Sequence, residues 1–346
     1  MSRENTVEFE VITRNGLQLY PLKDLSRARW LELRNMHGAI GGSDVGTIMG
    51  WNKRFSAIEL FYQKVGITFS NQDSQNQYTY WGSAIEGPLL NTAQFYDFDD
   101  PEAYLYNVTE GIIFRTITPF KYSVRNQKIP FANANVDGLI DFNPERFVAR
   151  RLAEAKCTSK QASEMWDTIP PYHIGQVLLY LAVLEPMLDE QVAEIYYLID
   201  GNKFSGWEIP QQPTLRDMII ERCDDFHAKI TKGIEIVINE LNPDLRTMAL
   251  QELEPPPDDT LGYEKFLKEI YLRKQNYVQI DGTQDLYEEA LRYKKAHGAM
   301  KELEAQKQSS KNIIWQALSR KNANTINFGT QGRITYSDKL YVNVKQ

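Results

Sequence analysis

Two strand-like segments in the middle of the chain place charged side chains within apolar surroundings. The first covers residues 131–142, reads FANANVDGLIDF and carries Asp137 near its centre, and the second ends in Ala153-Glu154-Ala155-Lys156. Short apolar segments bounded by turn residues are typical of buried strands, and Asn143-Pro144 supplies a turn after the first segment. A hairpin is the simplest geometry that places Asp137 beside Glu154. The sequence therefore predicts a sheet with acidic groups on adjacent strands.

The spacing within the second segment determines what these groups can do. Glu154 and Lys156 are two residues apart on an extended strand, so both side chains point to one face. Two carboxylates on adjacent strands can hold Mg²⁺ through oxygen ligands, and a lysine beside them can meet an attacking water or a charged phosphate. The pattern is that of a metal-dependent phosphodiesterase. The ordinary alternative is a scaffold protein in which Glu154 and Lys156 form a surface ion pair.

Composition excludes several other classes. The chain has 346 residues, of which 42% are hydrophobic and 25% charged, which is typical of a globular protein with two domains or one domain with an extension. No apolar run approaches the ~20 residues of a membrane helix, and the N-terminus lacks the apolar region of a signal peptide. We therefore expect a cytoplasmic protein without a membrane segment, located in the bacterial host cytoplasm if it is phage-encoded.

The cysteine, histidine and charge counts restrict the kind of site. Two cysteines are too few for a disulfide framework, a four-cysteine zinc site or an iron–sulfur cluster, and the four histidines show no ligand spacing. The net charge of −7 is unlike that of a nucleic-acid binder. Net charge is an average over the surface, however, so it does not exclude a local DNA-binding groove.

The order of turn and helix signals suggests three regions. Residues 1–24 form an N-terminal arm with a hairpin at Asn15-Gly16, and residues 25–210 form an α/β domain in which 103–125 are expected as strands. Residues 211–346 form a mainly helical extension with a terminal β-hairpin, and the proline-rich segment near 252–260 reads as a linker. A heptad register at Leu286, Tyr293, Met300 and Ile314 favours a helical hairpin or a coiled-coil partner surface.

Three further motifs surround the strand pair. Paired glycines in Gly41-Gly42-Ser43-Asp44 permit a tight loop, and a helix start with a hydroxyl suits a phosphate, although a capped helix start is the more ordinary interpretation. Glu86 lies beside the apolar stripe of its predicted helix and can face a buried site, but most glutamates on helices are solvated. Gln176, on a mostly apolar helix with Tyr172 and Tyr180, is either a satisfied core amide or a site residue.

Together these motifs form an ordered series over residues 28–210: Trp30-Leu31-Glu32-Leu33-Arg34, Ile40-Gly41-Gly42-Ser43-Asp44, Gly50-Trp51-Asn52, Glu59-Leu60, Lys64-Val65-Gly66, Trp81-Gly82-x-x-x-Glu86, Asn135-Val136-Asp137-Gly138, Glu154-Ala155-Lys156 and Tyr172-x-x-x-Gln176-Val177. The series resembles the lambda-exonuclease-like, or YqaJ-type viral recombinase, family of the PD-(D/E)xK nuclease superfamily. The resemblance implies a restriction-endonuclease-like α/β core with a mixed central sheet flanked by helices.

The resemblance also implies an activity. Such enzymes are Mg²⁺-dependent 5′-to-3′ exonucleases that degrade one strand of linear double-stranded DNA and leave 3′ single-stranded tails for phage-type recombination by single-strand annealing. Mn²⁺ is expected to be tolerated in place of Mg²⁺. The implied partners are double-stranded DNA ends, a single-strand annealing protein and further copies of the chain in a homo-trimer.

The same resemblance implies roles for individual residues. Lys156, Glu154 and Asp137 would be catalytic, and the metal would be held by Glu86, Asp137, Glu154 and the main-chain carbonyl of Ala155. The residues expected to bind the 5′-phosphate and the DNA are Arg34, Ser43 and Gln176.

Two alternatives remain open within this fold. One is a structure-specific or Cas4-like endonuclease, although Cas4-like enzymes usually use four cysteines for an iron–sulfur cluster. The other is a catalytically silent module that only binds DNA. The intact Asp137, Glu154 and Lys156 argue against the silent module.

Overall fold

The structure is a computed structural model that describes residues 9–67, 77–159, 168–271, 281–321, 323–336 and 340–344. The chain divides into two compact units, Met1–Arg273 and Lys274–Gln346, and each is described by itself.

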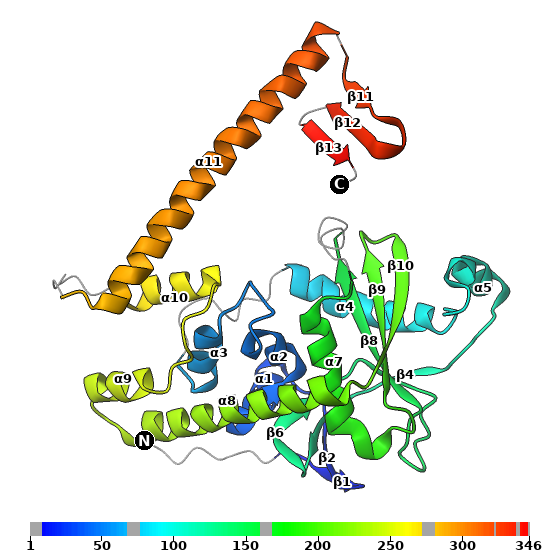
Figure 1. The fold of residues 1–346 in the computed structure, drawn as a ribbon. Helices are drawn as coiled ribbons and strands as arrows, with labels where there is room; N and C mark the ends of the chain where they lie inside the picture. The colour runs from blue at the N-terminus through cyan, green and yellow to red at the C-terminus, as the bar shows by residue number, and fades with distance from the viewer. Residues whose placement is uncertain are drawn as a thin grey trace. The chain divides into compact units, whose positions relative to one another are not determined.

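Two five-stranded sheets form the framework of the first unit (Figure 1). The first sheet has the order β1-β2-β5-β6-β3, and its strands are antiparallel except for the pair β3–β6. Its β1–β2 hairpin turns at Asn15-Gly16, as predicted, with φ angles of 50° and 76°; an Asn-Gly turn adopts such positive angles readily. The strands are β1 (Ile12–Arg14), β2 (Leu17–Pro21), β3 (Ile40–Gly41), β5 (Tyr122–Asn126) and β6 (Ile129–Ala134).

The second sheet contains the two segments that carry Asp137 and Glu154. Its order is β10-β9-β8-β7-β4, and only β8 and β9 run parallel. The predicted hairpin is formed by β7 and β8, with Gly138 opposite Ala153. The strands are β4 (Ile117–Pro119), β7 (Gly138–Ile140), β8 (Arg151–Thr158), β9 (Val192–Ile199) and β10 (Lys203–Pro210). Both sheets mix parallel and antiparallel pairs, so the predicted α/β class with flanking helices is confirmed, with two mixed sheets where one central sheet was expected.

Two helices cover opposite faces of this second sheet. Ala153 clusters with apolar residues of α4 (Gln77–Ala93), whereas its neighbour Leu152 belongs to the larger cluster around α7 (Pro171–Leu184). Neighbouring residues of a strand face opposite sides, so α4 and α7 lie on different faces. The remaining helices of this unit are α1 (Arg27–Asn35), α2 (Gly42–Ile48), α3 (Ala57–Lys64), α5 (Tyr104–Glu110), α8 (Pro213–Asn239), α9 (Pro243–Gln251) and α10 (Leu261–Tyr271), with 3-10 turns η1 (Met36–Gly38), η2 (Pro101–Ala103) and η3 (Glu185–Met187).

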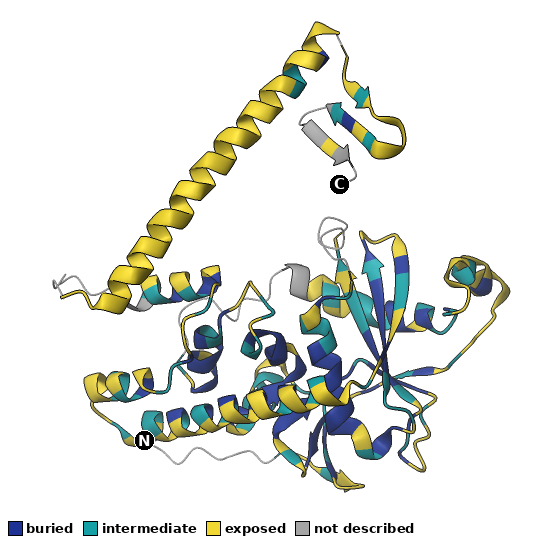
Figure 2. Ribbon diagram, viewed as in Figure 1, coloured by how far each residue is buried: buried dark blue, intermediate teal, exposed yellow. Residues whose placement is uncertain are grey.

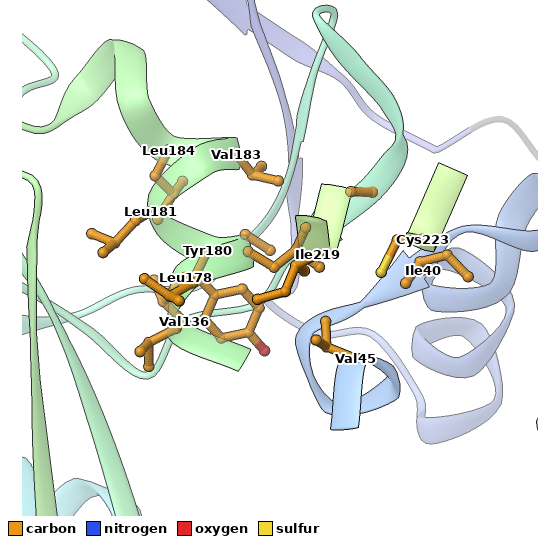
Figure 3. Close-up of a cluster of buried hydrophobic side chains, with 14 of the residues drawn as sticks. Ile40, Val45, Val136, Leu178, Tyr180, Leu181, Val183, Leu184, Ile219 and Cys223 are labelled. Carbon is orange, nitrogen blue, oxygen red and sulfur yellow. The ribbon is translucent and has the colours of Figure 1, made fainter. Parts of the chain in front are cut away.

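The core is centred on α7. This helix contacts β5 and β6 of the first sheet and β9 of the second, and it is buried along its length from Gly175 to Leu184 (Figure 2). Figure 3 shows Tyr180 of α7 beside Val136 and Leu178 in the main apolar cluster. A helix that is apolar on all sides belongs in the interior, so the polar Gln176 on α7 requires a specific partner.

The prediction of strands over residues 103–125 is wrong for its first part. Tyr104–Glu110 forms α5, which follows Pro101 at the start of η2 and ends at Gly111 with φ 71°. Strand structure begins only at Ile117. Tyr, Val and Thr favour strands, but their helix propensity is only slightly unfavourable. Proline at the start and a left-handed glycine at the end determine the outcome.

The segment predicted as a linker near 252–260 packs on α3. Asp258 Oδ2 accepts hydrogen bonds from Ser56 Oγ at 2.6 Å and from the Ala57 amide at 3.3 Å. The Tyr62 hydroxyl donates to Glu254 Oε1 at 2.6 Å. α10 continues this contact, with the ring of Phe266 5.1 Å from that of Tyr62. These contacts join the proline-rich segment and α10 to the first unit.

The second unit consists of a long helix, α11 (Gln284–Arg320), and a small antiparallel sheet. The sheet has the order β11-β12-β13 (Thr325–Asn327, Gly332–Tyr336 and Leu340–Val344), one strand more than the predicted hairpin, with the turn η4 (Gly329–Gln331) before β12. Leu286, Tyr293 and Met300 of the heptad register are 55%, 74% and 61% exposed, and their role as a partner surface stays a prediction. Across the residues the structure describes, no helix is long and apolar enough to span a bilayer.

Candidate active site

Asp137 is positioned at the point where β7 begins. Its Oδ2 accepts a hydrogen bond of 2.8 Å from the amide of Ala155 on β8, which holds the carboxylate against the neighbouring strand. The following glycine is required by packing, because a Cβ at Gly138 would lie 2.8 Å from Ile117 Cγ2. The Asp137-Gly138 pair thus places a carboxylate at the start of β7 without disturbing the neighbouring strand β4.

Glu154 and Lys156 share one face of β8, as predicted from their spacing. Lys156 Nζ lies 2.6 Å from Glu154 Oε1, and the Glu154 side chain is 2% exposed. The same oxygen accepts a 2.6 Å hydrogen bond from Gln176 Nε2 on α7. The second oxygen, Glu154 Oε2, is buried and has no hydrogen-bond partner among the described residues. Because a buried unpaired carboxylate oxygen is costly, this atom is poised to bind a ligand.

Glu86 of α4 lies within electrostatic reach of the same carboxylates. Burial raises the pKa of Glu86 to about 7, and the negative charge of Asp137 acts in the same direction. Burial and Asp137 likewise raise the pKa of Glu154 to about 8. Burial also raises the pKa of Asp137, against the opposing charge of Lys156. A nearby positive charge favours the ionised form of a carboxyl group. A bound cation would therefore stabilise these three groups as carboxylates.

Glu86, Asp137 and Lys156 line a cavity of about 830 Å³. Its walls also include α4 residues from Trp81 to Leu89, the end of β8, the β9–β10 turn and Arg54. Glu154 is not among the lining residues; its Oε1 is held by Lys156 and Gln176. Within the described ranges, the structure holds no group of three or more His, Cys, Asp or Glu side chains arranged to bind a metal ion. The metal-binding role of Glu86, Asp137, Glu154 and the Ala155 carbonyl stays a prediction.

A second polar cluster contains Arg34 and Ser43. The Arg34 guanidinium donates to Ser43 Oγ and lies 3.6 Å from Asp44 Oδ1. Asp44 also accepts from the amide of Gly41 at 2.9 Å, and its Oδ2 lies 2.8 Å from Nζ of the buried Lys64. Burial opposes ionisation of Asp44, but Lys64 and Arg34 hold its pKa below the usual value. The structure thus brings the two predicted phosphate-binding residues together and supports them from behind with a buried ion pair.

Gly42 connects the two clusters. A Cβ at this position would lie 2.5 Å from the Tyr180 ring and 2.8 Å from Gln176 Cγ, so the loop can approach α7 only as glycine. Tyr180 receives a 3.3 Å hydrogen bond from Gln176. Its pKa is raised by burial and by the charges of Glu154 and Asp137, whereas Arg34 lowers it. The Arg34 cluster and the carboxylates are therefore parts of one continuous site.

Sequence reasoning missed several residues at this site. The buried Lys64 gave no signal, because its position on an amphipathic helix does not distinguish it from a solvated lysine. Lys121 was also missed, although its positive charge partly counteracts the rise in the pKa values of Glu86 and Asp137. His173 was missed as well, and its Nδ1 lies 2.6 Å from Tyr197 Oη. Burial, with the charge of Lys156, lowers the pKa of His173 to about 3, which keeps its imidazole neutral.

Two strands and a helix that present carboxylates and a lysine to one cavity define the class of a phosphodiesterase-type site. Comparison with known families is consistent with this class. Residues 29–186 match the model of the YqaJ-like viral recombinase domain. The protein YqaJ of Bacillus subtilis strain 168, which is uncharacterised, is 29% identical over 307 residues, covering 88% of this chain and 80% of that protein. The chain is thus a homologue of YqaJ that contains a YqaJ-like viral recombinase domain at residues 29–186.

Two of the solved structures that resemble part of this chain are exonucleases. The alkaline exonuclease from Laribacter hongkongensis is 18% identical with a TM-score of 0.43, and the match covers 65% of this chain and 99% of that one. A phage-related exonuclease from Haemophilus somnus 129PT is 14% identical with a TM-score of 0.39, covering 61% and 100%.

Proposed function

We propose that this protein is a Mg²⁺-dependent 5′-to-3′ exonuclease that degrades one strand of linear double-stranded DNA. The family assignment supports a nuclease that acts on DNA, and the finer activity is our proposal. The observation that carries it is the environment of Glu154. Its carboxylate is held by Gln176 and Lys156, lies near Asp137 and Glu86, and has one buried oxygen without a partner.

The residues present fit a hard divalent cation. Carboxylate and carbonyl oxygens are the ligands that Mg²⁺ accepts, and Glu86, Asp137, Glu154 and the Ala155 carbonyl would supply them. When bound, Mg²⁺ would polarise the scissile phosphate and lower the pKa of a bound water. Its positive charge would also counteract the burial that raises the pKa of all three carboxyl groups and the negative charge of Asp137 that further raises the pKa of Glu86 and Glu154. Mn²⁺ takes similar oxygen ligands, and we expect it to substitute.

Lys156 would provide the positive charge of the chemical step. Burial favours its neutral form, but Glu154 and Asp137 outweigh that effect and raise the pKa of Lys156, so the ammonium group persists at neutral pH. From its place beside Glu154 it would orient the attacking water and offset the negative charge that develops on the phosphate. Gln176 would keep the Glu154 carboxylate in position through the 2.6 Å hydrogen bond.

Arg34 and Ser43 would receive the 5′-terminal phosphate. A guanidinium can bind a phosphate through two parallel hydrogen bonds, and the Arg34 side chain is 27% exposed next to the Ser43 hydroxyl. The buried pair Asp44–Lys64 holds this loop in place. A pocket for the terminal phosphate at a fixed distance from the carboxylates would give degradation its 5′-to-3′ direction. Backbone contacts suffice for such an enzyme, so sequence-independent cutting is expected.

The expected biological setting follows from the activity. Removal of one strand leaves a 3′ single-stranded tail, so we propose a single-strand annealing protein as the partner. We also propose a homo-trimer, which would allow the enzyme to stay on one DNA molecule.

The test is digestion of three substrates in Mg²⁺: linear duplex DNA with 5′-phosphate ends, the same duplex with 5′-hydroxyl ends, and a closed circle. We expect faster digestion of the phosphorylated ends and no cutting of the circle. Arg34→Ala should remove the preference between the two ends. Nicking of the circle would instead indicate an endonuclease, and equal rates on both ends by the wild type would contradict the phosphate pocket.

A further inference from the structure

The apolar stripe of α4 continues beyond the core into the cavity. Trp81, Ile85 and Leu89 are four residues apart, so they lie on one face of the helix. Leu89 is buried at 4% exposure, Ile85 is half-buried, and Trp81 is 58% exposed. All three line the cavity that also contains Asp137 and Lys156. The stripe thus ends in an indole ring that the chain does not bury.

The surroundings of Trp81 leave its ring accessible. Tyr80 contacts it edge-on, with ring centroids 5.4 Å apart and planes at 79°, and Tyr80 is itself 55% exposed. The adjoining Gly82 opens onto free space, since a Cβ there would meet nothing within 4 Å. Arg54 lines the same cavity and is exposed. An accessible indole and an exposed cation at one cavity suit a ligand with a flat aromatic part and a negative charge.

We propose that Trp81 is a stacking surface for a nucleobase of the DNA strand whose phosphate lies at Asp137, Glu154 and Lys156. This inference rests on the proposed function and names the contact that the base makes. A base is covalently tied to its phosphate, so a strand whose phosphate lies at Asp137 and Lys156 brings a base into the cavity that Trp81 also lines. Every base has a π-face, so stacking on an indole binds a strand without regard to sequence.

A double-mutant cycle between protein and DNA tests the contact. The full-length wild type and Trp81→Ala are compared on two duplexes, one intact and one with an abasic residue next to the terminal scissile phosphate. Loss of the indole alone and loss of the base alone should each slow single-turnover digestion about tenfold. Both losses together should slow it by about the same factor, because each removes the same contact. Trp81→Phe should keep most of the rate.

If the loss of the indole and the loss of the base together slow digestion about a hundredfold, the two effects are independent and the inference is overturned. A Trp81→Ala enzyme that digests at wild-type rates would also overturn it. Tyr106→Ala is the matched control, because Tyr106 is an exposed aromatic residue on α5, 63% accessible and outside the cavity, and this variant should digest both duplexes as the wild type does.

A binding measurement separates this inference from the proposed function. An oligonucleotide with 2-aminopurine at the same position is titrated with protein in Ca²⁺, and stacking on Trp81 should quench its fluorescence in the wild type and in Trp81→Phe but not in Trp81→Ala. Quenching by a protein that digests none of the DNA substrates would refute the exonuclease and retain the stacking surface. Digestion with equal quenching by the wild type and Trp81→Ala would refute only the stacking surface.

Discussion

The substitution Gln176→Leu distinguishes two possible roles of Gln176, which are to position Glu154 or to bind DNA directly. The family resemblance in the sequence implies that Gln176 binds the DNA substrate. In the structure its Nε2 donates to Glu154 Oε1 at 2.6 Å, and both side chains are buried, at 8% and 2% exposure. Leucine has a similar volume and cannot donate, so the substitution removes the hydrogen bond and leaves the packing on α7.

The expected magnitude follows from this geometry. A hydrogen bond to a charged group contributes about 1.5–3 kcal/mol, and every 1.4 kcal/mol corresponds to about a tenfold change in rate. If the bond holds Glu154 in its reactive position, kcat should fall about ten- to hundredfold, as for other residues that orient metal ligands. KM for DNA should stay within about twofold, because Gln176 does not then touch the substrate.

The assay is steady-state digestion of 5′-phosphorylated linear duplex, with urea unfolding as a check that the variant folds. Tyr180→Phe is the control, because it removes only the hydroxyl that accepts the 3.3 Å hydrogen bond from Gln176, and we expect a smaller loss of kcat. A raised KM with unchanged kcat in Gln176→Leu would show that Gln176 binds DNA directly and would refute this reasoning.

Two further predictions concern the loop beside α7. Gly42→Ala should destabilise the fold by about 1–3 kcal/mol in urea unfolding, because its Cβ would lie 2.5 Å from the Tyr180 ring. Gly87→Ala on α4 is the control, because a Cβ there meets no atom within 4 Å, and this variant should be neutral or slightly stabilising. Burial opposes ionisation of Asp44, but the charges of Lys64 and Arg34 hold its pKa in the folded state below the unfolded value of 3.8. The stability that this carboxylate contributes is therefore fully present above pH 3.8 and is lost as the pH falls through the lower folded pKa. Acid unfolding of Asp44→Asn should therefore show a weaker dependence on pH below about 4; an unchanged dependence would contradict the ion pair.

Local rules account for the part of the site that the sequence could predict. The shared face of Glu154 and Lys156 follows from the two-residue period of a strand, and the hairpin that brings Asp137 beside them needs only a turn between two apolar segments. Gly66 follows α3 with φ 86°, a left-handed conformation that favours glycine at the end of a helix. These features depend on residues close together in the chain.

Contacts between distant segments could not be read in this way. A lysine at the end of an amphipathic helix is expected to be solvated, yet Lys64 Nζ is buried against Asp44 and the Ala39 carbonyl. The proline-rich segment near 252–260 has the composition of a linker, yet Asp258 bonds Ser56 at the start of α3. Both outcomes depend on packing that brings separate helices together. In α5, by contrast, the error came from weighting strand-favouring side chains above the proline and glycine that bound the helix.

The most direct test of the central claim is strand-resolved digestion by the wild type and Lys156→Ala, with Lys128→Ala as an exposed lysine control on the β5–β6 turn. The substrate is a linear duplex with one phosphorylated 5′ end and a label at the 3′ end of that strand, incubated with and without Mg²⁺. We predict that the labelled strand shortens progressively from its 5′ end only with Mg²⁺ and that Lys128→Ala behaves as the wild type. Lys156→Ala should be at least about a hundredfold slower, with its affinity for DNA within about twofold of the wild-type value. Shortening from the 3′ end, or digestion by Lys156→Ala at the wild-type rate, would contradict the central claim.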